Sequence, residues 1–234
     1  EGDMTTVVAW LDAGGDVNDT VVGHSEHFIE GDTMLMAVAQ VEESFTRAHI
    51  ALAKLLLQRG ADVNGRSMAQ YLGDGFSVIH CCLDGIRNSE DPDRSSLLRE
   101  LLGIYMAAGA DLTAKTCTGY APLGMALECH FWCGDDTKRR SAFETVKLLL
   151  RHGAPIDACL QERDPTHYLG EFSVTAEAIL RRTEAQDRLR AMPYNLATDE
   201  YFVACKALVA DMCAAGGTWK QYVLHMPKAL LRLR

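Results

Sequence analysis

Apolar residues recur at the spacing of an amphipathic helix in several stretches of the chain. Apolar positions three and four residues apart fall on one face of an α-helix, so such stretches are typical of helices that bury one side. The clearest are residues 50–57, 97–106 and 146–150. Each is followed three residues later by a glycine, which can adopt the left-handed conformation that closes a helix. The pattern predicts several helices that end in the same way.

These helix ends belong to a segment that occurs five times. The copies read Leu11-Asp-Ala-Gly14-Gly-Asp-Val-Asn18, Leu57-Gln-Arg-Gly60-Ala-Asp-Val-Asn64, Met106-Ala-Ala-Gly109-Ala-Asp-Leu-Thr113, Leu150-Arg-His-Gly153-Ala-Pro-Ile-Asp157 and Cys213-Ala-Ala-Gly216-Gly-Thr-Trp-Lys220. Self-similarity of this kind indicates a repeat protein, in which each copy belongs to one supersecondary unit.

A second segment precedes the later helices. It reads Gly31-Asp-Thr-Met-Leu-Met-Ala-Val38, Gly75-Phe-Ser-Val-Ile-His-Cys-Cys82, Gly119-Tyr-Ala-Pro-Leu-Gly-Met-Ala126 and, more distantly, Glu171-Phe-Ser-Val-Thr-Ala-Glu-Ala178. Thr33, Ser77 and Ser173 carry the side-chain oxygen that caps a helix N-terminus, and Pro122 fits a first helical turn. We expect helices to begin at these four places.

Together the two segments resemble the ankyrin repeat, which has a Gly-x-Thr-Pro-Leu-His-x-Ala start, a helix pair and a Gly-Ala-Asp-Val-Asn end. The best agreement is at Gly60–Asn64 for the end and Gly75–Cys82 for the start. The resemblance covers nearly the whole chain and implies an all-α fold, an ankyrin-repeat solenoid of stacked helix pairs with finger loops. It implies one domain over residues 1–234, with a half repeat at 1–19, repeats at about 20–65, 66–114, 115–158 and 159–220, and a C-terminal capping helix at 221–234. The ending Trp219-Lys-Gln-Tyr222 is also similar to the endings of stand-alone ankyrin proteins of unicellular algae.

The units are longer than those of the family. Successive end glycines, from Gly14 to Gly216, are 46, 49, 44 and 63 residues apart, against about 33 in an ankyrin unit. Each unit therefore contains an insertion, and insertions in repeat proteins go to surface loops. We expect them at 85–94, 129–140 and 158–170, and at 183–199, where the insertion extends a helix and breaks it at Pro193.

Composition and charge narrow the range of functions. The chain is 48% hydrophobic and 24% charged, as in an ordinary folded protein, and its net charge is −9. Residues 1–64 hold 11 acidic and 3 basic side chains, and residues 65–234 hold 21 and 20. An acidic end either steers a basic partner or only aids solubility. It argues against binding to nucleic acid, which needs a basic face.

The chain lacks the marks of membrane insertion and of secretion. No apolar run approaches the about 20 residues that span a bilayer. The chain opens with neither an initiator Met nor a signal-peptide pattern, so we expect a fragment or a processed form. Six of the eight cysteines lie in or beside apolar helical patterns, where they act as small hydrophobes. We therefore expect free thiols and a reducing, intracellular compartment.

The resemblance also predicts a contact surface. The residue after the start glycine of an ankyrin unit faces the concave groove, and this column reads Asp32, Phe76, Tyr120 and Phe172. Aromatic rings on a rigid platform are typical anchors for a partner, although inserted loops could also cover them. A second column reads Gln40, Asp84, Glu128 and Leu180 and adds acidic groups. Together they predict a groove for a basic and apolar peptide or helix.

We expect no enzyme activity, no cofactor and no metal, because no catalytic, nucleotide or zinc motif occurs. His80 lies at the ankyrin histidine position, for which the resemblance implies a structural role. Cys129, His130 and Cys133 have ligand side chains but lack the second pair that a zinc site needs. Asn64 looks like the ankyrin asparagine that hydroxylases modify, or it only bonds its own loop backbone.

The sequence thus predicts a protein–protein interaction module that binds a partner protein through the concave face and the inserted loops. Two alternatives remain open. The chain could be a regulatory or targeting domain of a larger protein, or a structural subunit of a large assembly. The oligomeric state is not indicated.

Overall fold

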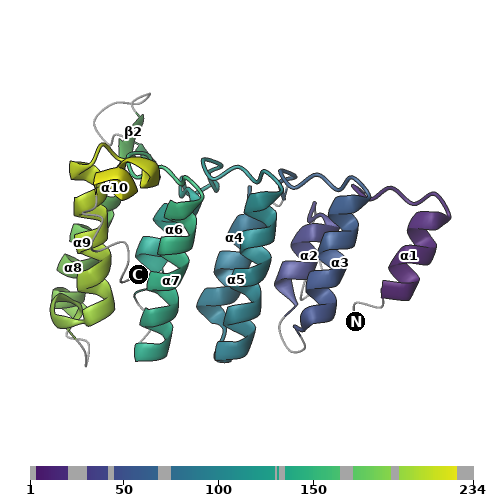
Figure 1. Ribbon diagram of the computed structural model, residues 1–234, viewed down its shortest axis with the longest axis horizontal. Coiled ribbons are helices and arrows are strands. Elements are labelled where there is room, and N and C mark those ends of the chain that lie inside the picture. Colours follow the sequence, from purple (N-terminus) through teal and green to yellow (C-terminus); the bar gives the residue numbers. More distant parts are fainter. Residues whose placement is uncertain are drawn as a thin grey trace. The chain divides into compact units, whose positions relative to one another are not determined.

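A computed structural model describes residues 4–20, 31–41, 45–67, 75–129, 131, 135–163, 171–190 and 195–225. The chain divides into two compact units, residues 1–117 and 118–234. The division falls just inside the predicted repeat 115–158. Most of the described residues are helical, as the all-α class predicts, and the second unit adds a short β-hairpin (Figure 1).

The first unit is built from helices joined by loops. These helices are α1 (Met4–Asp12), α2 (Met34–Gln40), α3 (Arg47–Gln58), α4 (Val78–Asn88) and α5 (Pro92–Ala107). Helix α2 packs beside α3, and α4 packs beside α5. The two pairs contact each other through α2 with α4 and through α3 with α5 (Figure 1). Leu35, Leu56, Ile79 and Leu101 are buried in this core, and each buried side chain of this size contributes about 1.5–3 kcal/mol.

Two polar side chains of α5 connect it to other helices of the first unit. The Tyr105 hydroxyl donates a hydrogen bond of 2.8 Å to the carbonyl oxygen of Leu35. Burial raises the pKa of Tyr105 well above its ordinary value, so the phenol keeps its proton as a donor. The Arg94 guanidinium donates to the carbonyl oxygens of Val41 and Gly85 over 3.0 and 3.2 Å. These bonds satisfy backbone carbonyls that would otherwise be left without a donor.

The helix starts of the first unit carry side-chain caps. The Thr33 hydroxyl accepts a hydrogen bond from the N–H of Met36 over 3.3 Å. Ser77 forms a capping box with His80, whose Nδ1 accepts from the Ser77 N–H over 3.2 Å. Each cap satisfies an N–H of the first helical turn. The predicted caps at Thr33 and Ser77 are confirmed.

Asparagine side chains connect successive loops of the first unit. The Asn18 amide donates to the carbonyl oxygen of Gly60 over 3.5 Å, and its oxygen accepts from the Asp62 N–H over 2.7 Å. One repeat further on, the Asn64 amide donates to the carbonyl oxygen of Gly109 over 3.2 Å and accepts from the Asp111 N–H over 2.8 Å. We call this pair of bonds the loop staple. It holds the ends of neighbouring helix pairs at a fixed spacing.

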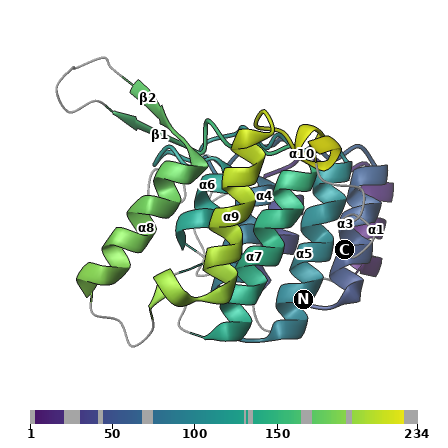
Figure 2. The same ribbon diagram turned by 60° about the vertical axis from the view of Figure 1, so that its left-hand side comes forward.

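The second unit contains two further helix pairs and the hairpin. Its elements are α6 (Pro122–Cys129), α7 (Asp136–Arg151), β1 (Leu160–Arg163), β2 (Glu171–Val174), α8 (Ala176–Arg190), η1 (Leu196–Thr198), α9 (Glu200–Ala214) and α10 (Trp219–His225). Helix α6 contacts α7 and α8, and α9 contacts α7, α8 and α10. Figure 2 shows the antiparallel hairpin leading directly into α8. The predicted extension of this helix is present up to Arg190, whereas Pro193 and residues 226–234 of the predicted capping helix lie outside the described residues.

The predicted helix start at residues 171–178 is wrong by two positions. Residues Glu171–Val174 form strand β2, in which Ser173 lies opposite Gln161, so Ser173 caps no helix. The hydroxyl of Thr175 instead accepts from the N–H of Ala178 over 3.3 Å, and α8 begins at Ala176. Thr175 is therefore the counterpart of Thr33 and Ser77. Residues 171–174 form a strand and not a helix start because β1 supplies backbone hydrogen-bond partners, which a local sequence pattern does not reveal.

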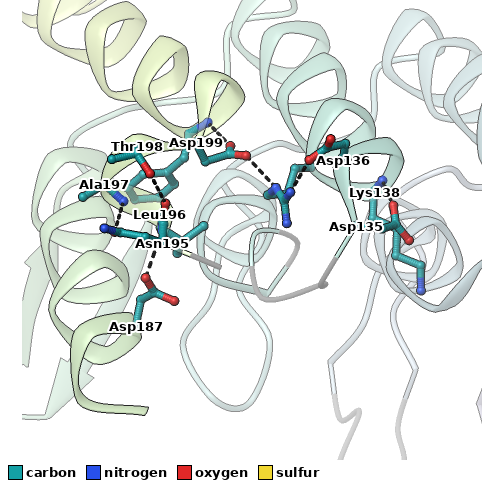
Figure 3. A network of polar contacts seen from close by, with 11 residues as sticks. Asp135, Asp136, Lys138, Asp187, Asn195, Leu196, Ala197, Thr198 and Asp199 are labelled. Atoms are coloured by element: carbon teal, nitrogen blue, oxygen red, sulfur yellow. Dashed lines mark hydrogen bonds and ion pairs between the residues drawn. The ribbon is translucent and has the colours of Figure 1, made fainter. Parts of the chain in front are cut away.

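Ionic contacts join α7, η1 and α9 of the second unit (Figure 3). Arg139 on α7 donates to the Asp199 carboxylate over 2.6 Å and also pairs with Asp136. The same Asp199 carboxylate caps α9 by accepting from the Phe202 N–H over 2.8 Å. Burial lowers the pKa of Arg139, but the charge of Asp199 and the hydrogen bonds outweigh it and the pKa is raised. The guanidinium therefore stays charged while it is almost fully covered.

Gly124 allows the backbone of the second unit to pack closely. A Cβ atom at this position of α6 would clash with the carbonyl oxygen of Cys159, just before β1. Gly124 occupies the position that His80 has in α4, counted from the helix start. Because Gly124 has no side chain, the segment that leads into the hairpin can lie against α6.

We predict that Asn64→Ala lowers the free energy of unfolding by about 1–2 kcal/mol, because it removes both bonds of one loop staple. Urea unfolding followed by circular dichroism measures the change. Gln58→Ala, which truncates an exposed amide at the end of α3, is the control and should change stability by less than about 0.5 kcal/mol. Equal effects of the two variants would contradict a stabilising role of the staple.

We predict opposite effects for two Gly→Ala substitutions inside helices. Gly124→Ala should destabilise by about 1–3 kcal/mol, because its new methyl group meets a backbone carbonyl that cannot move alone. Gly103→Ala on α5 has open space around the new methyl group and should stabilise by up to about 1 kcal/mol through helix propensity. Thermal unfolding of the two variants measures both changes. A stable Gly124→Ala protein would show that the close approach at Cys159 is not required.

Candidate functional site

Because α8 begins at Ala176, two residues later than predicted, different residues of α8 are equivalent to those of α2, α4 and α6. Gln40, Asp84 and Glu128 are the seventh residues of α2, α4 and α6, and the seventh residue of α8 is Arg182. Leu180, which the sequence pattern placed in this column, is buried in the core. The same shift makes Val174 the counterpart of Phe76 and Tyr120. Phe172 therefore belongs to the hairpin and not to that column.

Four polar side chains of the second unit converge where α6, α8 and the hairpin meet. Arg182 donates one hydrogen bond to Glu128 over 3.0 Å and another to Glu162 on β1. The Tyr120 hydroxyl donates to the same Glu128 oxygen over 2.5 Å. We call Tyr120, Glu128, Glu162 and Arg182 the hairpin cluster. Two of its members, Tyr120 and Glu128, were predicted as contact residues, and the other two were missed.

The hairpin cluster has an excess of negative charge. It contains two carboxylates and one guanidinium, and the side chains of Glu128 and Arg182 are only 16% and 34% exposed. Burial lowers the pKa of Arg182, but the hydrogen bonds and charges of Glu162 and Glu128 outweigh it, and the pKa is raised above the ordinary value. Arg182 therefore remains a cation at any physiological pH. One carboxylate charge of the cluster is left without a matching cation within it.

Phe172 lies beside the hairpin cluster with an exposed ring. In the β1–β2 register it is directly opposite Glu162, and directly opposed residues of an antiparallel pair point to the same face of the sheet. Phe172 is 47% exposed, an unusual state for so large an apolar side chain. The hairpin thus presents an aromatic ring next to a half-buried group of charges.

The predicted contact residues of the first unit are mostly engaged within the chain. Asp32 is 0% exposed, so the expectation that it faces an open groove is wrong. Phe76 is half-buried, and its ring lies 5.6 Å from that of His80. Asp84 pairs with Arg87 over 2.8 Å and accepts a hydrogen bond from Asn88. The half-buried Gln40 amide lies 3.7 Å from the sulfur of Cys81.

Asn64 and His80 have structural partners. The side chain of Asn64 bonds the following loop through the loop staple, and its N–H donates to Asp62 over 2.8 Å. The asparagine therefore connects two loops, whereas the sequence alone suggested a bond within one. His80 accepts from the Ser77 N–H and packs against Phe76. No described contact requires hydroxylation of Asn64, which stays a prediction.

The cysteines of the described residues form no disulfide. Cys81, Cys82, Cys159 and Cys205 are buried free thiols, as the apolar patterns predict, whereas Cys117 and Cys213 are exposed. Burial raises the pKa of Cys159 to about 12, so its thiol stays protonated and unreactive. His130 and Cys133 lie outside the described residues, as does the side chain of Cys129.

No group of three or more His, Cys, Asp or Glu side chains in the described ranges is placed to hold a metal ion. None of the helices in those ranges is both long and apolar enough to cross a bilayer.

No family model matches the chain, and no curated protein matches its sequence.

We predict that Arg182→Leu lowers the free energy of unfolding by about 1–2 kcal/mol, because it leaves the Glu128 and Glu162 carboxylates close together without their shared cation. The effect should be smaller than the about 3–5 kcal/mol of a fully buried pair, since solvent screens part of the interaction. Urea unfolding at low and high salt measures it. Arg181→Leu is the matched control, because Arg181 is 72% exposed on the same helix. Equal losses in both variants would contradict a stabilising cluster.

Proposed function

We propose that the chain is a divergent ankyrin-repeat protein that recognises a partner protein. Three features of the described residues support this. The segment-ending glycines Gly14, Gly60, Gly109, Gly153 and Gly216 all have positive φ. The helices pack as pairs, and the pairs within each unit contact one another through equivalent helices. The capped starts and the loop staples repeat from one helix pair to the next.

The exposed ring of Phe172 carries the functional part of the proposal. A large aromatic side chain on a two-stranded hairpin loses little entropy on binding and buries much area, which makes it a typical anchor of a protein interface. The hairpin cluster beside it fixes the backbone of β1 through Glu162. We therefore place the binding surface of the second unit on the hairpin and the adjacent faces of α6 and α8.

The charge of this surface favours a partner segment with both basic and apolar side chains. The hairpin cluster has one carboxylate more than it has cations. The chain as a whole has a net charge of −9, which speeds the approach of a basic segment at low ionic strength. An apolar side chain of the partner would cover Phe172, and a neighbouring Lys or Arg would face the surplus carboxylate.

A selection from a random peptide library displayed on phage tests this proposal. Selection on the purified chain should enrich peptides that combine Lys or Arg with aliphatic or aromatic residues. The Kd of an enriched peptide, measured by fluorescence anisotropy, should rise at least about tenfold in Phe172→Ala, because the anchor ring is lost.

Val203→Ala is the matched control for this experiment. Val203 is 45% exposed on α9, away from the hairpin in the chain, and its truncation should leave the Kd unchanged. Enrichment of acidic peptides, or an unchanged Kd in Phe172→Ala, would refute the proposed surface.

A further inference from the structure

The second unit departs from the loop staple at one position. Counted from the segment glycine, Thr113 and Asp157 hold the position of Asn18 and Asn64, and Gly216, in the loop after Asp157, corresponds to Gly60 and Gly109. An asparagine amide donates to the glycine carbonyl, whereas a carboxylate can only accept. Asp157 therefore cannot form the donor half of the staple. In the described part of the chain it makes no hydrogen bond or ion pair.

Two acceptors in this pair of loops have no donor among the described residues, and the missing amide accounts for one of them, the Gly216 carbonyl. One is the Asp157 carboxylate, which is exposed. The other is the Gly216 carbonyl oxygen, to which no described residue donates. In the first unit the equivalent carbonyl oxygens, those of Gly60 and Gly109, each accept a hydrogen bond from an asparagine amide.

An open cavity of about 470 Å³, lined mostly by exposed residues, lies between the same two loops. This volume is within the about 300–1,000 Å³ of typical ligand sites. Residues 153–157 line it on one side and residues 216–219 on the other, together with Thr175, Glu177 and Cys213. Pro155, Ile156 and Trp219 give it apolar walls, so it can take an aliphatic stem as well as a polar end.

The charges around the cavity favour a cation. Asp157 is an unpaired carboxylate, and Glu177 is a second carboxylate that is shared with Arg181. Burial and then the charge of Glu177 raise the pKa of Cys213, so this thiol is neutral and adds no charge of its own. Arg151 lies over the Trp219 ring, 5.3 Å from its centroid, and does not line the cavity. The unpaired charge that faces the cavity is therefore negative.

We propose that the cavity beside Asp157 binds a primary ammonium group, the end of a lysine side chain of the partner. An ammonium has three donors and no acceptor. It can bond the Asp157 carboxylate and the Gly216 carbonyl oxygen together, and so supply the donor that the asparagine amide supplies elsewhere. The four-carbon stem would lie along Pro155 and Ile156.

The cavity lies close in the chain to the proposed binding surface. That the ammonium group belongs to a lysine of the partner rests on the proposed function. Strand β2 ends at Val174, and the next residue, Thr175, lines the cavity. Phe172 is three residues before Thr175, about 10 Å along an extended chain. A partner segment that covers Phe172 would therefore need only a few further residues to bring a lysine side chain to Asp157.

A titration of the ¹⁵N-labelled chain with Nα-acetyl-lysine amide tests the site by NMR. The backbone N–H signals of Gly216, Gly217 and Thr218 should shift and saturate with a Kd on the order of 1 mM, as for a single weak ionic contact. Nα-acetyl-norleucine amide, which has a similar stem and no ammonium, should leave these signals in place.

Asp157→Asn is the decisive variant, because it introduces the residue found at positions 18 and 64 and can fold with a complete staple. It should raise the Kd for Nα-acetyl-lysine amide at least about tenfold, with an unfolding temperature no lower than that of the parent chain. An unchanged Kd in this variant would overturn the proposal. So would equal shifts with the norleucine compound or with calcium ions. Since the probe is a free amine, failure here would leave the peptide selection on Phe172 unaffected.

Discussion

One side-chain amide per repeat holds successive loops of the first unit together. Asn64 offers a donor and an acceptor at once, and it uses them on the carbonyl of Gly109 and the N–H of Asp111. The apolar core between α2, α3, α4 and α5 gives the larger share of stability. That core is not directional, whereas the hydrogen bonds between the loops are, and they join each loop to the next at defined atoms.

The second unit has the same arrangement of helix pairs, and it differs from the first unit at three places that shape its surface. Gly124 stands where α2 has Met36 and α4 has His80, and it admits the chain close to α6. The hairpin that follows brings Glu162 to Arg182 and leaves Phe172 exposed. Asp157 stands at the position of Asn18 and Asn64, and an open cavity lies between its loop and the next. The proposed recognition of a basic and apolar segment depends on these departures and not on the regular part of the repeat.

Local features of the fold were predictable from the sequence, and nonlocal ones were not. The end glycines and the caps at Thr33 and Ser77 depend on neighbours within four residues, so the repeat pattern identified them. Strand β2 depends on pairing with β1, and the Phe-Ser-Val at residues 172–174 imitates a helix start. Because the predicted start of α8 was two residues too early, Arg182 was not recognised as the equivalent of Glu128. The hairpin cluster was therefore not predicted as a group, and its members come from four places in the chain. The burial of Asp32 likewise depends on packing that no local pattern encodes.

Amide hydrogen exchange followed by NMR tests the loop staple most directly. After correction for intrinsic rates, the N–H groups of Asp62 and Asp111 should exchange at least about tenfold more slowly than that of Thr218, the corresponding residue in the loop that follows Asp157. In Asn64→Ala the protection of Asp111 should disappear while that of Asp62 remains. Equal exchange at all three residues in the parent chain would contradict the account.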